Sequence, residues 1–205
     1  TVHVVLDERT AGFVALGLSR QTDEPVALSC TSGSAGANYL PAVVEAYHAR
    51  RPLLVVTADR PAELQGRGAP QTMRQTNLYG HFVERCLDLP APMSIEDCVD
   101  VTRAAQELVQ TATQTLSPVH LNVAFREPLW SPAITLSHRV APAMLDVERT
   151  ADVPAAVRSL MSTGRGLIMC GPEAVSTPVG REAVLNLGER LGWPILAEAS
   201  SGVRF

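Results

Sequence analysis

Residues 25–59 read PVALSCTSGSAGANYLPAVVEAYHARRPLLVVTAD and contain the pattern that decides the fold. An apolar run at 25–30 is followed by a helical apolar pattern over 35–50 and by a second apolar run at 52–58. Two buried strands joined by an amphipathic helix are typical of a βαβ unit, in which the two strands run parallel. This stretch therefore predicts an α/β protein.

The alternation of strand-like and helix-like segments extends to both sides of this unit. Apolar strands that alternate with amphipathic helices indicate a mainly parallel sheet that helices cover on both faces. We therefore predict a doubly wound α/β fold. The further segments are strands at 3–6, 84–89 and 118–124 and helices at 8–21 and 95–114.

A proline-rich stretch without periodicity, residues 131–153, predicts a linker between two domains. It separates a first domain, residues 1–130, from residues 154–205, where strands and helices alternate again. We interpret the latter as the beginning of a second, truncated α/β domain. The chain opens in what resembles the end of a strand and closes just after another, so we expect it to be a fragment. The expected elements are helices at 154–162 and 180–192 and strands at 166–170 and 194–199.

The composition excludes several classes of protein. A chain with 46% hydrophobic and 19% charged residues is typical of a globular protein, and a net charge of −4 without a basic stripe argues against nucleic acid and membrane surfaces. No apolar run approaches the roughly 20 residues of a membrane span, and no signal peptide is visible. We expect a cytoplasmic protein. The four cysteines form no CxxC pair, which argues against zinc and disulfides and favours small core residues: Cys30, Cys86, Cys98 and Cys170.

All 17 lysine and arginine positions are arginine. Schiff-base aldolases, pyridoxal phosphate enzymes and P-loop proteins need a lysine amine, so these classes are excluded. Arginine instead suits planar, bidentate capture of carboxylates and stays charged when partly buried. The basic residues therefore favour anionic, carboxylate-bearing ligands.

Three strand ends carry the candidate functional residues, because ligands of open α/β sheets bind beyond the carboxyl ends of the strands. The first is LDER at 6–9, the second CTSGSAGAN at 30–38, and the third TADRP at 57–61, which precedes a long polar loop. Long loops at this edge of a sheet usually carry function.

Each strand end also has a purely structural interpretation. Asp7 and Glu8 suit the start of a helix, where a side chain caps free N–H groups and an acid meets the positive end of the dipole. The turn at 31–33 offers N–H groups that can hold an anion or simply cap the next helix. Asp59 and Arg60 suit an ion pair or a turn cap. The five histidines are scattered, and we interpret all of them as structural or surface residues.

Four stretches resemble the family of 2-succinyl-5-enolpyruvyl-6-hydroxy-3-cyclohexene-1-carboxylate synthases, which are thiamine diphosphate enzymes of menaquinone biosynthesis. The resemblance is dense over residues 3–90, weaker to 128, and loose in the second domain. It implies that residues 1–130 are the pyrimidine-binding domain of the thiamine diphosphate-binding fold. The stretches are LDERTAGFVALGL, PVALSCTSGSAGANYLPAVVEA, RRPLLVVTADRPAEL and GAPQTMRQTNLYG.

The resemblance implies a role for six residues. Glu8 matches the glutamate that these enzymes direct at N1′ of the aminopyrimidine ring, and would be the catalytic residue. Thr31, Ser32 and Gly33 match the turn that lines the pyrimidine end of the cofactor. On the substrate side, Arg60 would bind a carboxylate and Gln71 would orient the acceptor or intermediate.

The implied reaction decarboxylates 2-oxoglutarate on thiamine diphosphate and adds the product carbanion to isochorismate. Mg²⁺ or Mn²⁺ anchors the diphosphate in this family, through ligands that would lie beyond Phe205, so none of the residues 1–205 is expected to bind metal. A second subunit supplies the diphosphate-binding domain, which implies a homodimer or homotetramer. By itself, this chain is expected to be inactive.

Other functions remain open at this point. The chain would also suit another thiamine diphosphate decarboxylase or carboligase, such as a relative of acetolactate synthase, although DER, TADRP and GAPQ argue against it. From different classes come a non-catalytic interaction domain with the same fold and a nucleotide-binding module built on TSGS.

Overall fold

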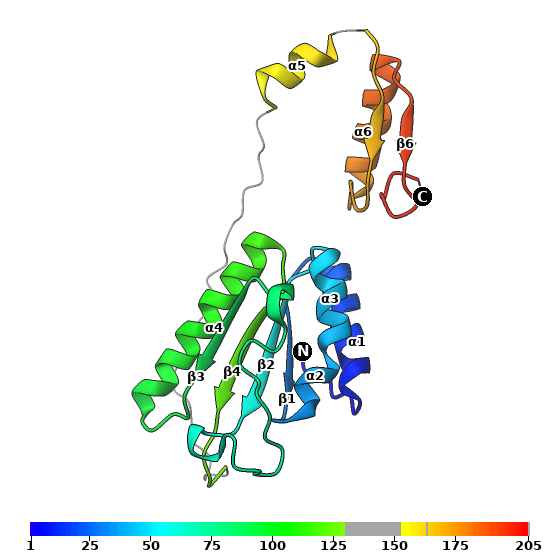
Figure 1. The fold of residues 1–205 in the computed structure, drawn as a ribbon. Helices are drawn as coiled ribbons and strands as arrows, with labels where there is room; N and C mark the ends of the chain where they lie inside the picture. Colours follow the sequence, from blue (N-terminus) through cyan, green and yellow to red (C-terminus); the bar gives the residue numbers. More distant parts are fainter. Residues whose placement is uncertain (130–152, 163, 205) are drawn as a thin grey trace. The chain divides into compact units, whose positions relative to one another are not determined.

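The computed structural model describes residues 1–129, 153–162 and 164–204 (Figure 1). The chain divides into two compact units, Thr1–Val147 and Glu148–Phe205. The expected linker, residues 131–153, lies outside the described residues except for Val153. The candidate site lies in the first unit.

The first unit is built on a four-stranded sheet in the order β1-β2-β4-β3 (Figure 1). All three pairs of neighbouring strands are parallel, as predicted. Parallel pairing brings the carboxyl ends of all four strands to one edge of the sheet. The strands are β1 (Val26–Cys30), β2 (Leu53–Asp59), β3 (Arg85–Leu89) and β4 (Val119–Ala124).

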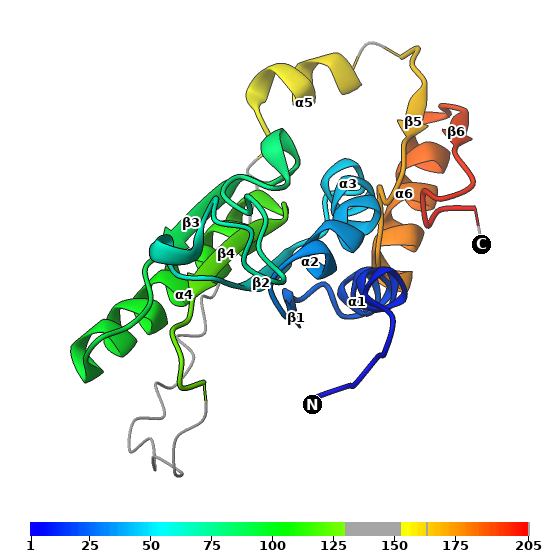
Figure 2. The same cartoon turned by 60° about the horizontal axis from the view of Figure 1, so that its bottom comes forward.

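Helices cover both faces of this sheet. In Figure 2, α4 lies on one side of the sheet and α2 and α3 lie on the other. Two short 3₁₀ helices, η1 (Ala62–Leu64) and η2 (Gly80–Phe82), lie in the connection from β2 to β3. The α-helices are α1 (Glu8–Thr22), α2 (Ser34–Asn38), α3 (Leu40–His48) and α4 (Ile95–Thr115).

The side chains of β2 alternate between two hydrophobic cores. Leu53 and Val55 pack in one core with residues of α1 and α3, whereas Leu54 packs in the other with Leu108 of α4. A strand that is buried on both faces needs apolar residues in succession, which explains the unbroken run of β2. The prediction of a doubly wound α/β fold is thus confirmed.

The helix expected over residues 35–50 is two helices, α2 and α3, that meet at Tyr39. Proline lacks a backbone N–H and restricts the residue before it, so Pro41 fits only the first turn of a new helix. The prediction of one continuous helix was wrong because it ignored this proline.

Residues 3–6 do not form the expected strand. A strand needs a neighbour to satisfy its backbone groups, and none of the described strands pairs with this segment. Val2, Val4 and Leu6 are 91%, 87% and 96% exposed. The β-branched pattern was therefore not sufficient to place this segment in the sheet.

The cysteines agree only in part with the sequence analysis. All four are free thiols; Cys170 is buried, Cys30 and Cys86 are half-buried, and Cys98 is exposed. Cys98 therefore contradicts the interpretation of all four as core residues. Cys98 lies in the first turns of α4, and the residues of α4 that pack in the core come later in the helix.

The second unit also contains parallel strands with a helix between them. β5 (Ile168–Cys170) pairs with β6 (Ile195–Ala197), and α6 (Pro178–Leu191) connects them. The helix α5 (Ala155–Met161) precedes β5. This is the βαβ pattern that the sequence predicts for a second α/β domain.

Candidate functional site

Asp7 and Glu8, adjacent acids at the start of α1, have different environments. The Asp7 carboxylate accepts hydrogen bonds from the backbone N–H and the hydroxyl of Thr10, both at 2.7 Å. These hydrogen bonds lower the pKa of Asp7. Asp7 is therefore the N-cap of α1, and the helix needs nothing further from Glu8 for capping.

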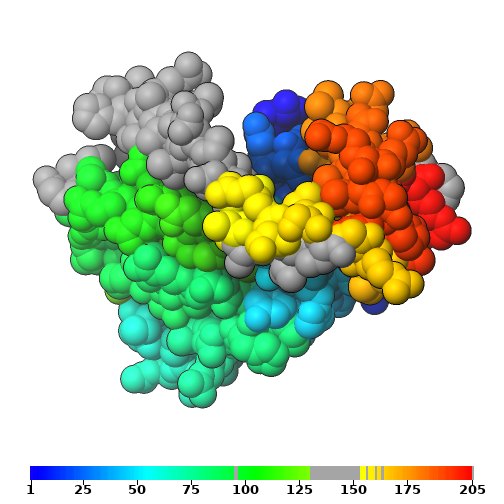
Figure 3. All heavy atoms as spheres, turned by 90° about the horizontal axis from the view of Figure 1, so that it is seen from above, coloured from blue at the N-terminus to red at the C-terminus, as the bar shows by residue number. Residues whose placement is uncertain are grey.

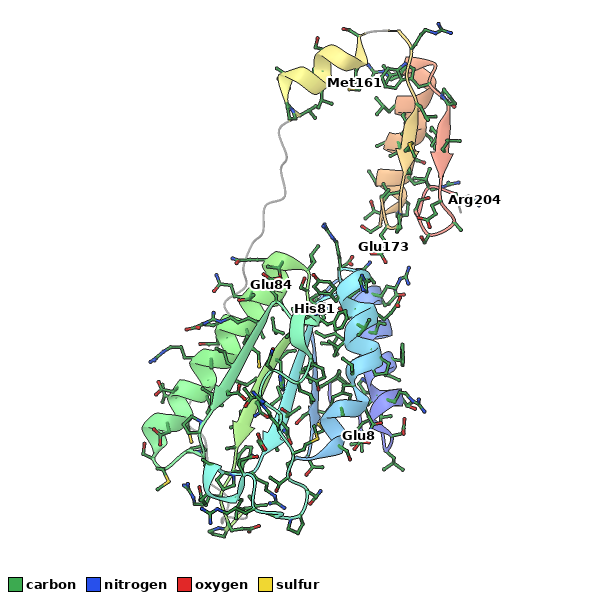
Figure 4. All side chains as sticks on the ribbon, in the orientation of Figure 1. Glu8, His81, Glu84, Met161, Glu173 and Arg204 are labelled. Carbon is green, nitrogen blue, oxygen red and sulfur yellow. The ribbon has the colours of Figure 1, made fainter. Side chains whose placement is uncertain are left out.

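Glu8 is half-buried and has no hydrogen-bond or ion-pair partner among the described residues. Its charge acts on the end of β1: burial raises the pKa of the Cys30 thiol to about 11, and the Glu8 carboxylate adds to the increase. Figure 4 shows Glu8 beside α2, at the edge of the sheet where the strands end, whereas Glu84, just before β3, lies at the opposite edge.

Glu8 lines a small pocket, the Glu8 pocket, with a volume of about 270 Å³. Five of the six residues predicted for the site line it, although they come from three separate stretches of the sequence. Its lining residues are Glu8, Thr31, Ser32, Gly33, Ser34, Ala35, Asn38 and Gln71.

The turn from β1 to α2 and the loop after β2 meet at Gly33. Gly33 has a φ of +85°, and a Cβ atom there would lie 3.3 Å from Cα of Gln71. Gln71 itself has a φ of +53°. Since the two backbones touch, only glycine suits this position, and the contact brings Gln71 into the same pocket as Glu8.

Arg60, the sixth predicted residue, lines a different and larger pocket of about 770 Å³, the Arg60 pocket. Its Nε donates a hydrogen bond of 3.4 Å to the carbonyl of Pro70, and its other guanidinium nitrogens bond none of the described residues. The prediction that Gln71 and Arg60 both face the substrate stays a prediction: they line different pockets, but Arg60 bonds the carbonyl of the residue directly before Gln71. Other polar residues of the Arg60 pocket are Asp59, Gln65, Arg74, Gln75, Thr76, Asp88, Asn122 and Arg126.

Asp59 does not form an ion pair with Arg60. One oxygen of its carboxylate accepts hydrogen bonds from the backbone N–H of Arg60 at 2.7 Å and from Gln65 Nε2 at 3.1 Å. The other oxygen accepts from Asn122 Nδ2 at 2.8 Å. Of the two structural interpretations, the turn cap is correct, and the Arg60 guanidinium is left for other partners.

A polar network forms part of the wall of the Arg60 pocket and reaches the wall of the Glu8 pocket at Gly33. Asn122 is at its centre: its Nδ2 donates to Asp59 and Asp88, both at 2.8 Å, and its Oδ1 accepts from Thr57 and Gln75 at 2.6 and 3.0 Å. All four bonds that the Asn122 amide can form to these side chains are made, which stabilises a single arrangement of the network. Figure 3 views the first unit from the opposite edge, where the strands begin, and shows the segment between β2 and β3 (cyan to blue-green) and α4 (green) there.

The direction of these bonds fixes the tautomer of His120. Thr57 donates its hydroxyl hydrogen to Asn122, so the contact of 2.8 Å between Thr57 Oγ1 and His120 Nε2 requires a hydrogen on Nε2. Nδ1 then accepts from the Cys86 thiol at 3.3 Å. Burial raises the pKa of Cys86 and lowers that of His120 to about 4, so both groups are neutral at pH 7.

The sequence analysis gave no role to Gln75, Asn122 and Asp88, but the sequence does contain a signal for Asn122 and Asp88. Thr57, Asn122 and Asp88 are polar residues near the ends of β2, β4 and β3, and each lies between two apolar residues. The parallel register places Thr57 and Asp88 on either side of Asn122, in one row across the sheet. One polar residue in each of three neighbouring strands predicts such a row once the strand order is known.

The described residues contain no group of three or more histidine, cysteine or acidic side chains placed to hold a metal ion. Within the same residues, no helix has the length and apolar character that crossing a bilayer requires.

Comparison with known proteins matches a thiamine diphosphate family. Residues 1–78 match the family described as "Thiamine pyrophosphate enzyme, N-terminal TPP binding domain". This range contains all six of the predicted site residues.

The whole chain is similar to curated 2-succinyl-5-enolpyruvyl-6-hydroxy-3-cyclohexene-1-carboxylate synthases. It is 42% identical to the protein of Geobacillus kaustophilus (strain HTA426), over 99% of this chain and 37% of that protein. Identity to the protein of Roseiflexus sp. (strain RS-1) is 41%, over 98% of this chain and 38% of the relative. The chain therefore spans little more than a third of the length of these relatives, and the resemblance to their family is confirmed.

Among solved structures, the chain is similar to a thiamine diphosphate-dependent 4-hydroxybenzoylformate decarboxylase from Rhodococcus jostii RHA1. The TM-score is 0.65 over 93% of this chain and 36% of the other, at 18% sequence identity. This likeness concerns the fold alone, and it agrees with the α/β architecture described above.

Proposed function

We propose that this chain is the pyrimidine-binding part of a thiamine diphosphate-dependent synthase that decarboxylates 2-oxoglutarate and adds the product to isochorismate. Similarity to synthases over nearly the whole chain supports the family, and the match at residues 1–78 supports the cofactor. The proposal includes the six site residues, whose roles follow from the resemblance and from the two pockets.

The observation that carries the proposal is the half-buried Glu8 carboxylate without a partner among the described residues, in a pocket at the strand ends. Leaving a partly buried charge without a hydrogen bond costs free energy, so a ligand that donates to it is favoured. Asp7 already caps the helix, which removes the structural reason for a second acid. A protonated ring nitrogen such as N1′ of the aminopyrimidine fits this carboxylate.

The turn at 31–33 fits a ring better than a phosphate. The N–H of Gly33 is donated to Gln75 Oε1 at 2.7 Å, so it is not available to an anion. The helix that follows, α2, has only five residues and a small dipole. This argues against the nucleotide-binding module and favours Thr31, Ser32 and Gly33 as one wall of a cofactor pocket.

Bound thiamine diphosphate supplies the carbon that accepts the electrons of decarboxylation. Glu8 holds a proton at N1′ of the ring and keeps the ring oriented. Arg60 binds a carboxylate of the dicarboxylic substrate with its free guanidinium nitrogens, in the geometry that suits carboxylates. Gln71, next to Gly33, orients the acceptor or intermediate from the cofactor side.

The remaining parts of the proposed enzyme lie outside this chain. Mg²⁺ or Mn²⁺ and its ligands, together with the diphosphate-binding domain, would come from a second subunit of a homodimer or homotetramer. We also propose that the enzyme is cytoplasmic. The described residues have no metal-ligand cluster of their own, so titration of this chain with cofactor is expected to show weak binding without turnover.

Replacing Glu8 in the complete enzyme tests the proposal. The variant Glu8→Gln keeps the shape of the side chain but removes its charge, and exchange of the C2 proton of bound cofactor is expected to slow by about 100-fold or more. NMR detection of the C2 proton measures this rate. The matched control is Asp7→Asn, which removes the adjacent charge at the helix cap and leaves Glu8 in place.

The two variants separate catalysis from helix stability. Asp7→Asn is expected to lower the melting temperature slightly and to leave the exchange rate unchanged, because the cap acts on α1 alone. Unchanged exchange in Glu8→Gln would contradict the role of Glu8. Absence of cofactor binding by the unmodified complete protein would contradict the proposed function itself.

A further inference from the structure

We propose that Gln75 is a positioning residue that holds the Glu8 pocket and the Arg60 pocket in a fixed relation through its side-chain amide. The inference rests on the proposed function, because it takes the first pocket as the cofactor site and the second as the dicarboxylate site. It adds a residue to which neither the family resemblance nor the site prediction gave a role.

The Gln75 side chain is 1% exposed, and all of its polar groups are used. Oε1 accepts the backbone N–H of Gly33 at 2.7 Å. Nε2 donates to the carbonyl of Ala58 at 2.8 Å and to Asn122 Oδ1 at 3.0 Å. One side chain from the loop after β2 thus connects the end of β1, the end of β2 and the middle of β4.

The orientation of the Gln75 amide is fixed by its partners. The backbone N–H of Gly33 can only donate and the carbonyl of Ala58 can only accept, so a rotated amide would place donor against donor and acceptor against acceptor. Asn122 is fixed in the same way, because its Nδ2 faces the carboxylates of Asp59 and Asp88. Buried polar groups without partners are costly, so the network has one arrangement.

Towards the Glu8 pocket, Gln75 acts through Gly33. Gly33 touches the backbone of Gln71, and both residues line the pocket. The hydrogen bond to the Gly33 N–H therefore sets the position of the wall that Gly33 and Gln71 share.

Gln75 itself lines the Arg60 pocket, and it is connected to Arg60 through Asn122. Asn122 Nδ2 donates to Asp59, and the other Asp59 oxygen accepts the backbone N–H of Arg60 at 2.7 Å. The hydrogen-bonded path from Gly33 to Arg60 is thus continuous, and Gln75 is its first side chain. Displacement of the Gln75 amide is expected to move both ends of the path.

Gln65 provides a matched control from the same loop. Its Nε2 donates to Asp59 Oδ1 and to the carbonyl of Arg60, both at 3.1 Å, and it makes no contact with Gly33 that would connect it to the Glu8 pocket. The same change from glutamine to leucine at 65 and at 75 therefore compares an effect on one pocket with an effect on both.

The experiment measures two constants in the complete enzyme: the dissociation constant of thiamine diphosphate and the Michaelis constant for 2-oxoglutarate. In Gln75→Leu both are expected to rise by about tenfold, the effect of losing one good hydrogen bond at each pocket, and kcat is expected to fall less. In Gln65→Leu only the Michaelis constant for 2-oxoglutarate is expected to rise.

A second variant covers the case in which Gln75→Leu does not fold. In Gln75→Glu, a protonated carboxyl group still accepts from Gly33 and donates one hydrogen bond, whereas an ionised one repels Ala58 and Asn122 through their oxygens. Burial raises the pKa of a carboxyl group, so a glutamate at position 75 is expected to stay protonated to a higher pH than an exposed one. Relative to the unmodified enzyme at the same pH, both constants are therefore expected to be near normal at pH 6 and raised at pH 8.

A lower melting temperature with both constants unchanged would overturn the proposal, because Gln75 would then be a core residue only. An effect on the cofactor constant alone would also overturn it. Amide hydrogen exchange at Gly33 and Arg60 distinguishes these results from failure of the proposed function. If Gln75→Leu accelerates exchange at both amides, Gln75 connects the two pockets even in an enzyme with other substrates; acceleration at Gly33 alone refutes the connection.

Discussion

Polar side chains are paired in the network that lines the Arg60 pocket, whereas a central polar side chain of the Glu8 pocket is unpaired within the described residues. In the network, Asn122, Gln75 and Thr57 are buried and every bond that their side chains can make to each other and to the strand ends is made. In the Glu8 pocket, the carboxylate of Glu8 is half-buried and unpaired within the described residues. The comparison indicates that a rigid, satisfied layer supports groups that are left for a ligand.

The same contrast separates Arg60 from its neighbour Asp59. Asp59 is 7% exposed and uses both carboxylate oxygens for hydrogen bonds within the protein. Within the part of the chain that the structure describes, the Arg60 guanidinium bonds through Nε alone, at 3.4 Å to the carbonyl of Pro70. Of two adjacent residues of opposite charge, one therefore holds the structure and the other faces the pocket.

The largest expected effect comes from breaking the network at its centre. Asn122→Leu removes the donor to Asp59 and Asp88 and leaves two carboxylates facing an apolar side chain. Asp88 is exposed and can be hydrated, but the buried Asp59 loses the donor to one carboxylate oxygen, so the free energy of unfolding is expected to fall by about 3 kcal/mol. Urea denaturation measures it. The control Asn38→Leu, at an exposed position, is expected to change it by less than about 0.5 kcal/mol. A loss below about 1 kcal/mol in Asn122→Leu would show that the network is not a supporting layer.

A smaller effect is expected from removing the Arg60 side chain. In the complete enzyme, Arg60→Ala is expected to raise the Michaelis constant for 2-oxoglutarate by about 10- to 100-fold, the value of a charged hydrogen bond, without weakening cofactor binding. Arg67→Ala is the control, since Arg67 is exposed on the same loop and lines neither pocket. Steady-state kinetics and cofactor titration distinguish the two constants. Weaker cofactor binding with a normal Michaelis constant would assign Arg60 to the other pocket.

The smallest of these effects is the pH dependence of the free energy of unfolding that comes from His120. Burial lowers the pKa of His120 to about 4, whereas the unfolded chain binds this proton near pH 6.5. Between these values only the unfolded chain is protonated at His120, so stability falls as the pH falls. From pH 7.5 to pH 5 the free energy of unfolding is expected to drop by about 2 kcal/mol through this residue.

The variant His120→Gln isolates the contribution of this histidine. The variant lacks the titrating ring. Its free energy of unfolding is therefore expected to drop by about 2 kcal/mol less than that of the unmodified protein over the same pH range, even if the variant is less stable at every pH. Urea denaturation of both proteins at pH 7.5 and pH 5 gives the comparison. An identical drop in the two proteins would mean that burial does not lower the pKa of His120 in the folded protein.

Much of the fold follows from local pattern. The strands from β1 to β4 were predicted within one or two residues, because each is an apolar run between clear helical segments. Segment 3–6 has an equally good β-branched pattern and forms no strand, since strand formation depends on a partner in space. The break at Tyr39 was visible in Pro41.

The site was predictable to a different degree in its two parts. Glu8, the turn at 31–33 and Gln71 follow from the resemblance, and the structure brings them into one pocket. Gln75 and Asn122 carry no local signal strong enough to select them from other polar residues. Their importance comes from strand order, which places β4 between β2 and β3.

By itself, the sequence determined the parallel α/β architecture, the arginine-only basic chemistry and the three polar strand ends. These properties are local, since apolar periodicity and residue type suffice to predict them. Only the tertiary structure decided that Asp7 caps α1 while Glu8 lacks a partner among the described residues, that Gln71 and Arg60 line separate pockets, and that Gln75 lies between them. These depend on distances between residues far apart in the chain, and such distances are set by packing and strand order rather than by local pattern.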